Sequence, residues 1–225
     1  MDHTELVLRE ELCRAAQLLY QRGYVVGHDG NLSIRLGEDR ILITPSGVSK
    51  GRLEPDMLVV CDLEGRVLSG ERYPSSETAM HLLVYGERPD AGAVVHAHPP
   101  MATAFAIRRT PLKEAYLTET VSGLGEVPVA PFAMPSTREV PESIRPFVAH
   151  HSAVLLANHG ALAWGRDLWE AFDRMETVEQ TAKIYAWVQL LGGGEALTQE
   201  QTQGLLALSS RYERLAGRRE SGKED

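Results

Sequence analysis

Two histidines, His96 and His98, stand two residues apart at the end of the apolar, valine-rich run Ala91–His98. On a strand, residues at this spacing project from the same face, while Ala97 points to the other face. Two imidazoles side by side can provide two ligands of a metal site. They can equally be polar residues at a strand end that hydrogen bond to the backbone. The pair alone leaves both interpretations open.

A third histidine, His159, follows a second apolar run, Ala153–Ala157, within the motif Asn158-His159-Gly160. The glycine allows the chain to turn sharply beside a ligand. Three histidines at strand ends fit catalytic zinc, which commonly takes three protein ligands and leaves a position open for water or substrate. Manganese, cobalt and iron(II) also bind imidazole, so the pattern predicts the ligand set rather than one particular metal.

Glu77 ends the motif Ser75-Ser76-Glu77, at the start of a helix predicted over Ser75–Tyr85. A glutamate in a first turn is ordinarily a surface charge that complements the helix dipole. Two preceding hydroxyls change this interpretation, because hydroxyls and backbone N–H groups at a helix start form a concavity suited to phosphate. Glu77 would then stand beside a phosphate site, where a carboxylate can bind metal or exchange protons with a substrate.

Two further segments, Gly30-Asn31-Leu32-Ser33 and Thr44-Pro45-Ser46-Gly47, supply donors of the same kind. Each is also compatible with an ordinary turn. Their occurrence together with the serine pair and the three histidines is what indicates a binding site.

The elements that must position these residues alternate between helices and short strands. Apolar residues at three- and four-residue steps predict helices, and short apolar or alternating runs predict strands. The predicted helices are 6–22, 75–85, 102–107 and 169–191, and the predicted strands are 31–36, 40–44, 57–62, 66–68, 91–98 and 153–157. The stretch before residue 153 is rich in proline and glycine and predicts loops. We expect one domain over residues 1–225, with a frayed tail over 210–225.

The composition limits the partners of this chain. The sequence has 23 basic and 31 acidic residues, a net charge of −8, and no long basic run before the tail, which disfavours nucleic acid and anionic membranes. A small anionic substrate remains compatible, since a few local donors can outweigh an unfavourable overall field. With Cys13 and Cys61 as its only cysteines, no export signal and no long apolar stretch, the chain is expected in the cytoplasm.

In their order and spacing, these motifs resemble those of the class II aldolase and adducin family, and within it the L-fuculose-1-phosphate aldolases. The resemblance extends from about residue 10 to about residue 191 and is carried by Gly30-Asn31, Thr44-Pro45-Ser46-Gly47, Pro74-Ser75-Ser76-Glu77, His96-Ala97-His98-Pro99 and Asn158-His159-Gly160. It implies a single three-layer α/β/α domain with a central, largely antiparallel sheet. It also implies a homotetramer with active sites between neighbouring subunits.

The resemblance also assigns roles to residues. Zinc would be bound by His96, His98, His159 and Glu77, and the substrate phosphate by Gly30, Asn31, Ser46, Gly47, Ser75 and Ser76. Glu77 would carry the proton. A tyrosine would handle the proton on the aldehyde oxygen, either Tyr116 or, from a neighbouring subunit, Tyr212. The sequence departs from the family at Pro135-Ser136-Thr137, where many relatives have Pro-Gly-Thr.

The expected function is the reversible cleavage of a ketose 1-phosphate, such as L-fuculose 1-phosphate or a related deoxy-ketose phosphate, to dihydroxyacetone phosphate and a small aldehyde. The same scaffold also hosts sugar-phosphate epimerases, dehydratases of the methylthioribulose-phosphate type and decarboxylases of sugar-acid phosphates. A non-enzyme alternative is an adducin-like interaction module that keeps the fold without the catalytic residues. All three histidines and the glutamate are present here, which favours an enzyme.

Overall fold

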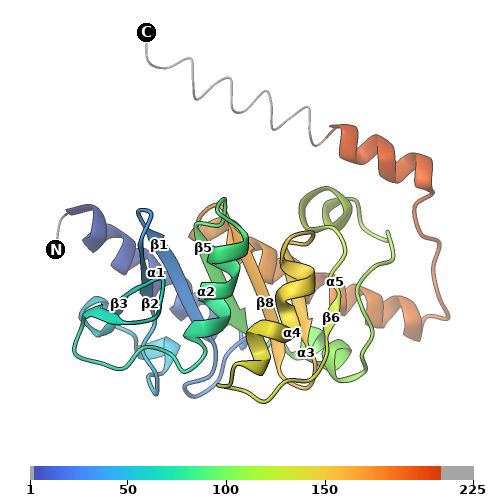
Figure 1. The fold of residues 1–225 in the computed structure, drawn as a ribbon. Helices are drawn as coiled ribbons and strands as arrows, with labels where there is room; N and C mark the ends of the chain where they lie inside the picture. Colours follow the sequence, from blue (N-terminus) through green and yellow to red (C-terminus); the bar gives the residue numbers. More distant parts are fainter. Residues whose placement is uncertain (1–2, 209–225) are drawn as a thin grey trace, which may run out of the picture.

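An open sheet forms the centre of the fold, as Figure 1 shows for residues 3–208, the part of this computed structural model that is described. Its eight strands lie in the order β4-β3-β2-β1-β5-β8-β7-β6, and each neighbouring pair is antiparallel except β6 with β7. The strands are β1 (Asn31–Leu36), β2 (Arg40–Ile43), β3 (Val59–Asp62), β4 (Val67–Ser69), β5 (Ala93–Ala97), β6 (Val129–Ala130), β7 (Ala153–Leu156) and β8 (Gly160–Gly165). The tail predicted over 210–225, with Tyr212, lies outside the described residues.

Helices connect and cover the strands. The main ones are α1 (His3–Gln21), α2 (Thr78–Glu87), α3 (Pro100–Ile107), α4 (Glu139–Val148) and α5 (Leu168–Leu190). Shorter helical turns are η1 (Lys50–Arg52), η2 (Pro55–Met57) and the π-helical η3 (Thr120–Leu124), and residues 199–208 are also helical. In the described part of the chain, no helix combines the length and the apolar character that a membrane span requires.

The helices form a layer on each face of the sheet. Helices α1, α3 and α5 pack on one face, and α2 and α4 pack on the other, where they lie in front of the strands in Figure 1. Alternation along β5 separates the two cores, because Val95 lies in the core with α1, α3 and α5, whereas Val94 lies in the core with α2 and α4. The predicted three-layer α/β/α fold with a largely antiparallel sheet is confirmed.

The structure contains two elements that were not predicted from the sequence. The stretch before residue 153 contains α4, although it was predicted as loops from its prolines. Pro141 is tolerated because it lies in the first turn, whose N–H groups have no intrahelical partner, while Pro146 lies inside the helix. Strand β8 was not predicted, since all six of its residues are buried and its sequence Gly-Ala-Leu-Ala-Trp-Gly has no alternation of polar and apolar residues.

The helix predicted from Ser75 begins three residues later, at Thr78. Ser75 and Ser76 instead belong to a turn that precedes it. The carbonyl oxygen of Ser75 accepts hydrogen bonds from the Thr78 N–H at 3.1 Å and from the Thr78 hydroxyl at 2.6 Å. This turn places Glu77 at the N-cap of α2, where its side chain is free to point away from the helix.

A buried carboxylate from α5 anchors the start of α3, just after His98. Glu179 is fully buried, and its Oε2 accepts hydrogen bonds from the backbone N–H groups of Met101 at 3.0 Å and Ala102 at 2.9 Å. The Lys183 ammonium lies 3.3 Å from its other oxygen. Since the first N–H groups of a helix lack intrahelical acceptors, the carboxylate satisfies them and complements the helix dipole. Helix α5 thereby holds the segment that carries His98.

Replacing this carboxylate should destabilise the fold. Glu179→Ala leaves two N–H groups at the start of α3, one buried and one half-buried, without an acceptor, so we expect the free energy of unfolding in urea to fall by about 2–3 kcal/mol. Glu38→Ala, in the exposed turn between β1 and β2, is the matched control and should change stability by less than about 0.5 kcal/mol. Equal stability of the two variants would contradict an anchoring role for Glu179.

Candidate active site

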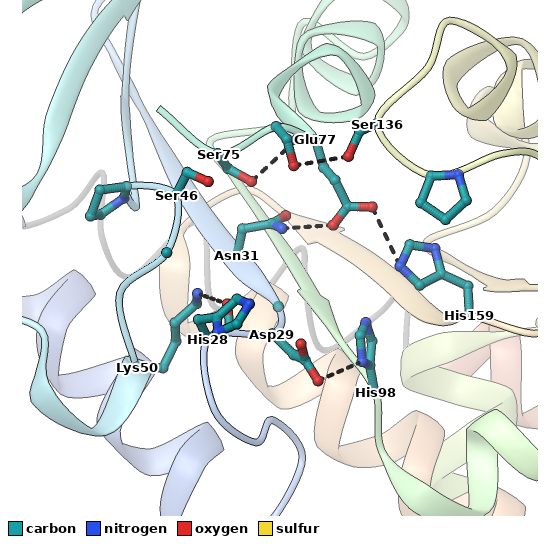
Figure 2. Close-up of a pocket in the computed structure, with 15 residues that line it drawn as sticks. His28, Asp29, Asn31, Ser46, Lys50, Ser75, Glu77, His98, Ser136 and His159 are labelled. Atoms are coloured by element: carbon teal, nitrogen blue, oxygen red, sulfur yellow. Dashed lines mark hydrogen bonds and ion pairs between the residues drawn. The ribbon is translucent and has the colours of Figure 1, made fainter. Parts of the chain in front are cut away.

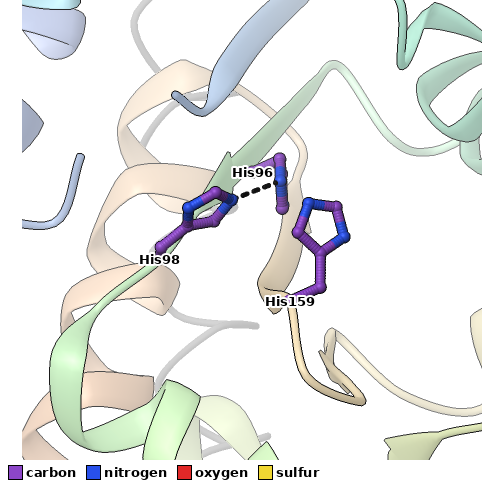
Figure 3. A group of neighbouring side chains, drawn as sticks. All are labelled: His96, His98 and His159. Carbon is purple, nitrogen blue, oxygen red and sulfur yellow. Dashed lines mark hydrogen bonds between the residues drawn. The ribbon is translucent and has the colours of Figure 1, made fainter. Parts of the chain in front are cut away.

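Three histidines lie close together where strand β5 ends and strand β8 begins (Figure 3). His96 lies on β5, His98 follows the end of that strand, and His159 lies in the turn between β7 and β8. Strand β5 pairs antiparallel with β8, with Ala97 opposite Ala161, so the end of one strand lies beside the start of the other. The ring centroids are 4.7 to 5.0 Å apart, and one nitrogen of each ring lies within 4.8 Å of the others. The structure therefore brings the three predicted metal ligands together.

The backbone around His159 explains the Asn-His-Gly motif. Asn158 has a φ of +57°, in the left-handed region that asparagine tolerates better than most residues. A Cβ on Gly160 would lie 2.4 Å from the Ala97 carbonyl oxygen and 2.6 Å from Cδ2 of His98. Glycine is the residue that permits this approach of backbone to backbone. The two flanking residues thus let His159 reach the other rings.

Glu77 directs its carboxylate into the histidine cluster, as Figure 2 shows for its contact with His159. Its Oε2 lies 3.3 Å from Nε2 of His96 and accepts a hydrogen bond from Nδ2 of Asn31 at 2.9 Å. Its Oε1 lies 3.4 Å from Nε2 of His159, is buried, and has no hydrogen-bond partner among the described residues. Buried carboxylate oxygens are ordinarily satisfied. A buried carboxylate whose oxygens lie beside His96 and His159, one of them without a hydrogen-bond partner in the described residues, fits a metal ligand better than a surface charge at a helix start.

Burial and neighbouring charges set the protonation of the cluster. Burial, reinforced by His96 and His159, lowers the pKa of His98 to about 3, and burial with His96 lowers the pKa of His159 to about 4. Burial also opposes protonation of His96, but the Glu77 carboxylate outweighs it and raises the pKa of His96. For Glu77, burial raises the pKa, yet the attraction of His96 and His159 and the Asn31 hydrogen bond together hold it well below its usual range.

At neutral pH the cluster therefore contains two neutral imidazoles, His98 and His159, and an ionised carboxylate beside His96. Nitrogen and carboxylate donors of this kind bind divalent transition metals such as zinc. The Nδ1 of His96 lies 2.9 Å from the Ala161 carbonyl oxygen, which leaves its Nε2 to face the other rings. Such a hydrogen bond to the second ring nitrogen is how metal-binding histidines are held in orientation.

A row of buried polar groups connects Glu77 to the interior between β1 and α2. Nε2 of His81 lies 2.6 Å from Oδ1 of Asn31, Nδ1 of His81 lies 2.7 Å from Oγ of Ser33, and that hydroxyl lies 2.8 Å from Oη of Tyr85. An amide oxygen can only accept, so Nε2 of His81 donates to Asn31, and its Nδ1 accepts from Ser33. The Asn31 amide is thereby oriented with its NH₂ group toward Glu77.

Sequence reasoning did not identify His81 as part of this site. The available signal was its position four residues after Glu77 on a helix, which places both on one face. The apolar neighbours of His81 on α2 gave no reason to separate it from the core.

The pocket beside the histidines is a cavity of about 190 Å³, shown in Figure 2. Glu77, His98 and His159 line one part of it. Its wall also contains every residue that the resemblance assigned to phosphate: Gly30, Asn31, Ser46, Gly47, Ser75 and Ser76. Serine hydroxyls and glycine backbone therefore lie next to the candidate metal ligands, within one cavity.

Ser136, where many relatives have glycine, also lines this pocket. Its φ of +61° lies in the left-handed region, so the backbone keeps a conformation that favours glycine. The Ser136 hydroxyl donates a hydrogen bond to Oγ of Ser76 at 2.9 Å. The departure from the family pattern thus adds a polar group at the pocket wall.

Tyr116 lies apart from this pocket within its own chain. Its ring packs edge-on against Tyr185 of α5, with centroids 5.0 Å apart, and it is absent from the described residues that line the cavity. Its predicted part in proton transfer stays a prediction that requires a neighbouring subunit. Tyr212 lies outside the described residues.

Residues 10–186 match the profile of the Class II Aldolase and Adducin N-terminal domain. The chain belongs to the class II aldolase and adducin family. It is therefore a member of an enzyme family whose activities include those of aldolases, decarboxylases and dehydratases and whose substrates are small phosphorylated sugars.

The relatives of this chain within the class II aldolase family are named for different reactions. The chain is 36% identical to a 3-oxo-tetronate 4-phosphate decarboxylase of Haemophilus influenzae, over 83% of this chain and 90% of that protein. It is 34% identical to a 5-methylthioribulose-1-phosphate/5-deoxyribulose-1-phosphate aldolase of Rhodospirillum rubrum, over 94% and 95%. Among solved structures, an L-fuculose 1-phosphate aldolase superimposes with a TM-score of 0.83 at 36% identity, covering 89% of this chain and 94% of that one.

The buried histidine of the polar row should make stability depend on pH. Burial lowers the pKa of His81 to about 3, below its value in the unfolded chain, so the unfolded state binds the additional proton as pH falls below about 6.5. Between pH 7 and pH 5 we expect the wild type to lose about 2 kcal/mol of stability from this group alone. His81→Gln should lack this loss in urea unfolding, whereas His150→Gln, at an exposed position, should retain it. Equal pH dependence of all three proteins would contradict this prediction.

Proposed function

We propose that this protein is a divalent-metal-dependent lyase that cleaves the C3–C4 bond of a ketose 1-phosphate, giving dihydroxyacetone phosphate and a small aldehyde. The observation that carries the proposal is the cluster of three imidazoles beside Glu77, whose buried Oε1 has no hydrogen-bond partner among the described residues, next to a cavity lined by serine hydroxyls. The family relationship supports a reaction on a phosphorylated sugar.

His96, His98 and His159 would hold the metal, with Glu77 as an additional ligand in the resting site. Zinc fits this set best, because its catalytic sites commonly use three protein ligands of this type. When bound, the metal would stabilise the negative charge that develops on the substrate oxygens as the bond breaks. No lysine Schiff base is then required.

The phosphate would lie against the hydroxyls of Ser46, Ser75 and Ser76 and the backbone N–H of Gly47. Two of these groups, the Ser75 and Ser76 hydroxyls, come from the turn before α2, where the positive end of the helix dipole favours an anion. Binding the phosphate there would place the ketone carbon toward the histidines, since both features line the same cavity. The binding energy of the phosphate, which does not itself react, would in this way orient the reacting carbons.

Glu77 would move the proton. When the C3–C4 bond breaks, the electron pair remains on C3 as part of an enediolate, and the C4 hydroxyl loses its proton as the aldehyde forms. Glu77, ionised in the resting site, would take up the proton that the C4 hydroxyl releases, passed on by a second base, and would deliver it to C3 to complete dihydroxyacetone phosphate. In the synthetic direction it would remove that proton. Asn31, oriented by His81, would keep the Glu77 carboxylate aimed at this position.

The C4 hydroxyl proton needs a second base. We propose Tyr116 from a neighbouring subunit, with Tyr212 as the alternative. The proposal includes a homotetramer with active sites between subunits, because Tyr116 packs against Tyr185 and does not line the cavity of its own chain, so it could act only in the site of a neighbour. Two free, buried cysteines, Cys13 and Cys61, are compatible with a cytoplasmic enzyme.

A decarboxylase is the second candidate, favoured by the 36% identical relative from Haemophilus influenzae. Loss of carbon dioxide from a four-carbon 3-oxo acid that carries phosphate on C4 leaves the same enediolate. That reaction produces no aldehyde, so it needs Glu77 but no tyrosine base. The cavity within one described chain, which Tyr116 does not line, would be sufficient for it.

The products distinguish these reactions. The purified protein would be incubated with L-fuculose 1-phosphate, 5-deoxyribulose 1-phosphate and 3-oxo-tetronate 4-phosphate, with and without a chelator, and triose phosphate, aldehyde and carbon dioxide would be measured. We expect triose phosphate and aldehyde in equal amounts, lost on chelation and restored by zinc. Carbon dioxide in place of aldehyde would show a decarboxylase, and loss of water without triose phosphate a dehydratase. Absence of any conversion, including epimerisation, would contradict an enzyme of this class.

Removing one imidazole should abolish activity without unfolding the chain. His98→Ala should lose roughly 1000-fold or more of the turnover number and the bound metal measured by elemental analysis, because charge stabilisation by the metal contributes several kcal/mol. His98 lies after the end of β5 rather than within a core, so the melting temperature of the metal-free protein should change little. His150→Ala, at an exposed position, is the control and should keep both metal and activity. A His98→Ala variant with normal metal content and turnover would exclude the proposed ligand set.

A further inference from the structure

The pocket contains one cation that neither the motifs nor the resemblance assigned. Lys50 begins η1, three residues after Gly47, and is the one lysine or arginine among the described residues that line the cavity. Figure 2 shows it on the same side of the pocket as Ser46, across the cavity from His159. The residue is only 2% exposed, although lysine is rarely buried without a partner.

The Lys50 ammonium has two protein acceptors. Its Nζ donates to the His28 carbonyl oxygen at 2.7 Å and to the Val48 carbonyl oxygen at 3.1 Å. An ammonium has three N–H groups, so one remains without an acceptor in the described part of the chain. No carboxylate among the described residues lies within ion-pair distance of it. Burial accordingly lowers the pKa of Lys50 to about 8, despite the attraction of Asp29 and Glu77.

The two carbonyl contacts join the two loops that flank the pocket, one before Gly30 and one after Gly47. Tying loops together does not by itself require a charge, because a neutral amide offers two N–H groups at lower desolvation cost. A buried charge without an ionic partner is costly, and an anionic ligand would compensate it. The buried charge of Lys50 therefore indicates that this residue binds an anionic ligand, in addition to connecting the loops.

The electrostatics of the cavity give the same indication. Asp29 and Glu77 line it, and their carboxylates oppose the entry of an anion. The other donors at the phosphate end, the hydroxyls of Ser46, Ser75 and Ser76, are neutral. A phosphate monoester carries close to two negative charges at neutral pH. Hydrogen bonds from a charged donor to such an oxygen are about twice as strong as neutral ones.

We propose that Lys50 provides the positive charge of the phosphate subsite and makes the pocket select phosphorylated substrates over unphosphorylated ones. The proposal rests on the proposed function in its choice of ligand, a phosphate ester, but extends the binding set by a residue outside the motifs. The third N–H of Lys50 donates to a phosphate oxygen, while the other two hold the loops at His28 and Val48.

Inorganic phosphate is a direct probe, since it tests the subsite without turnover. Its binding to the metal-loaded wild type, Lys50→Met and Lys50→Gln would be measured by isothermal titration calorimetry. We expect both variants to bind phosphate about tenfold or more weakly, the consequence of losing one charge-assisted hydrogen bond. Lys50→Gln retains N–H donors for the loop carbonyls, so it keeps the test valid if Lys50→Met does not fold. Lys113→Met, at an exposed lysine outside this cavity, should bind phosphate as the wild type does.

Two results would overturn the role of Lys50: phosphate affinity in Lys50→Gln equal to that of the wild type, or no phosphate binding by the wild type itself. Failure of the proposed function would look different, because the wild type would convert no ketose phosphate while its phosphate affinity still depended on Lys50. Where substrate is converted, kcat/KM for the phosphorylated ketose should fall in the variants by the same factor as the phosphate affinity. A fall in kcat/KM with unchanged phosphate affinity would also count against a phosphate contact.

Discussion

The antiparallel pairing of β5 with β1 on one side and β8 on the other is the constraint on which the site depends. Its register places Asn31 opposite His96 and Ala97 opposite Ala161. Because the side chains of a strand alternate between faces, a slip of one residue would turn His96 into the opposite core and separate it from Glu77. Hydrogen bonds between these strands, together with the two cores they bury, fix the geometry of the cluster before any ligand binds.

The face of β1 that carries Asn31 and Ser33 is polar, although it lies under α2 in an otherwise apolar layer. Burying such groups is unfavourable unless each finds a partner. His81 and Tyr85 provide these partners, so the row is satisfied from Tyr85 to Asn31 and ends at Glu77. The unsatisfied atom is Oε1 of Glu77, at the point where the row reaches the cavity. Within this row the unsatisfied atom is the one at the cavity, which indicates a position kept for function.

The aldolase and decarboxylase reactions named for the relatives make similar electrostatic demands on a site. Cleavage to an aldehyde and loss of carbon dioxide leave the same enediolate, and both need charge stabilisation and one proton on carbon. The groups that would serve these needs come from the sheet ends and the start of α2, which the fold holds rigidly. The groups that would determine which of these reactions the site performs lie in the outer loops, at Ser136 and in the segment around Tyr116. Such loops can change without disturbing the register of the strands.

The sequence by itself determined the His96–His98 pair, the glycine turn after His159 and most elements, because these depend on local spacing: two residues along a strand, three or four along a helix, and glycine at sharp turns. That His159 meets the other two rings depends on the pairing of β5 with β8. It did not determine α4, whose prolines resemble those of a loop, or β8, whose small residues lack alternation. Only the tertiary structure decided that His81 orients Asn31, that Lys50 lies in the cavity and that Tyr116 does not. These contacts join residues that are 22 to 50 positions apart or face a cavity walled by several elements. They follow from strand register and layer packing, which no local pattern encodes.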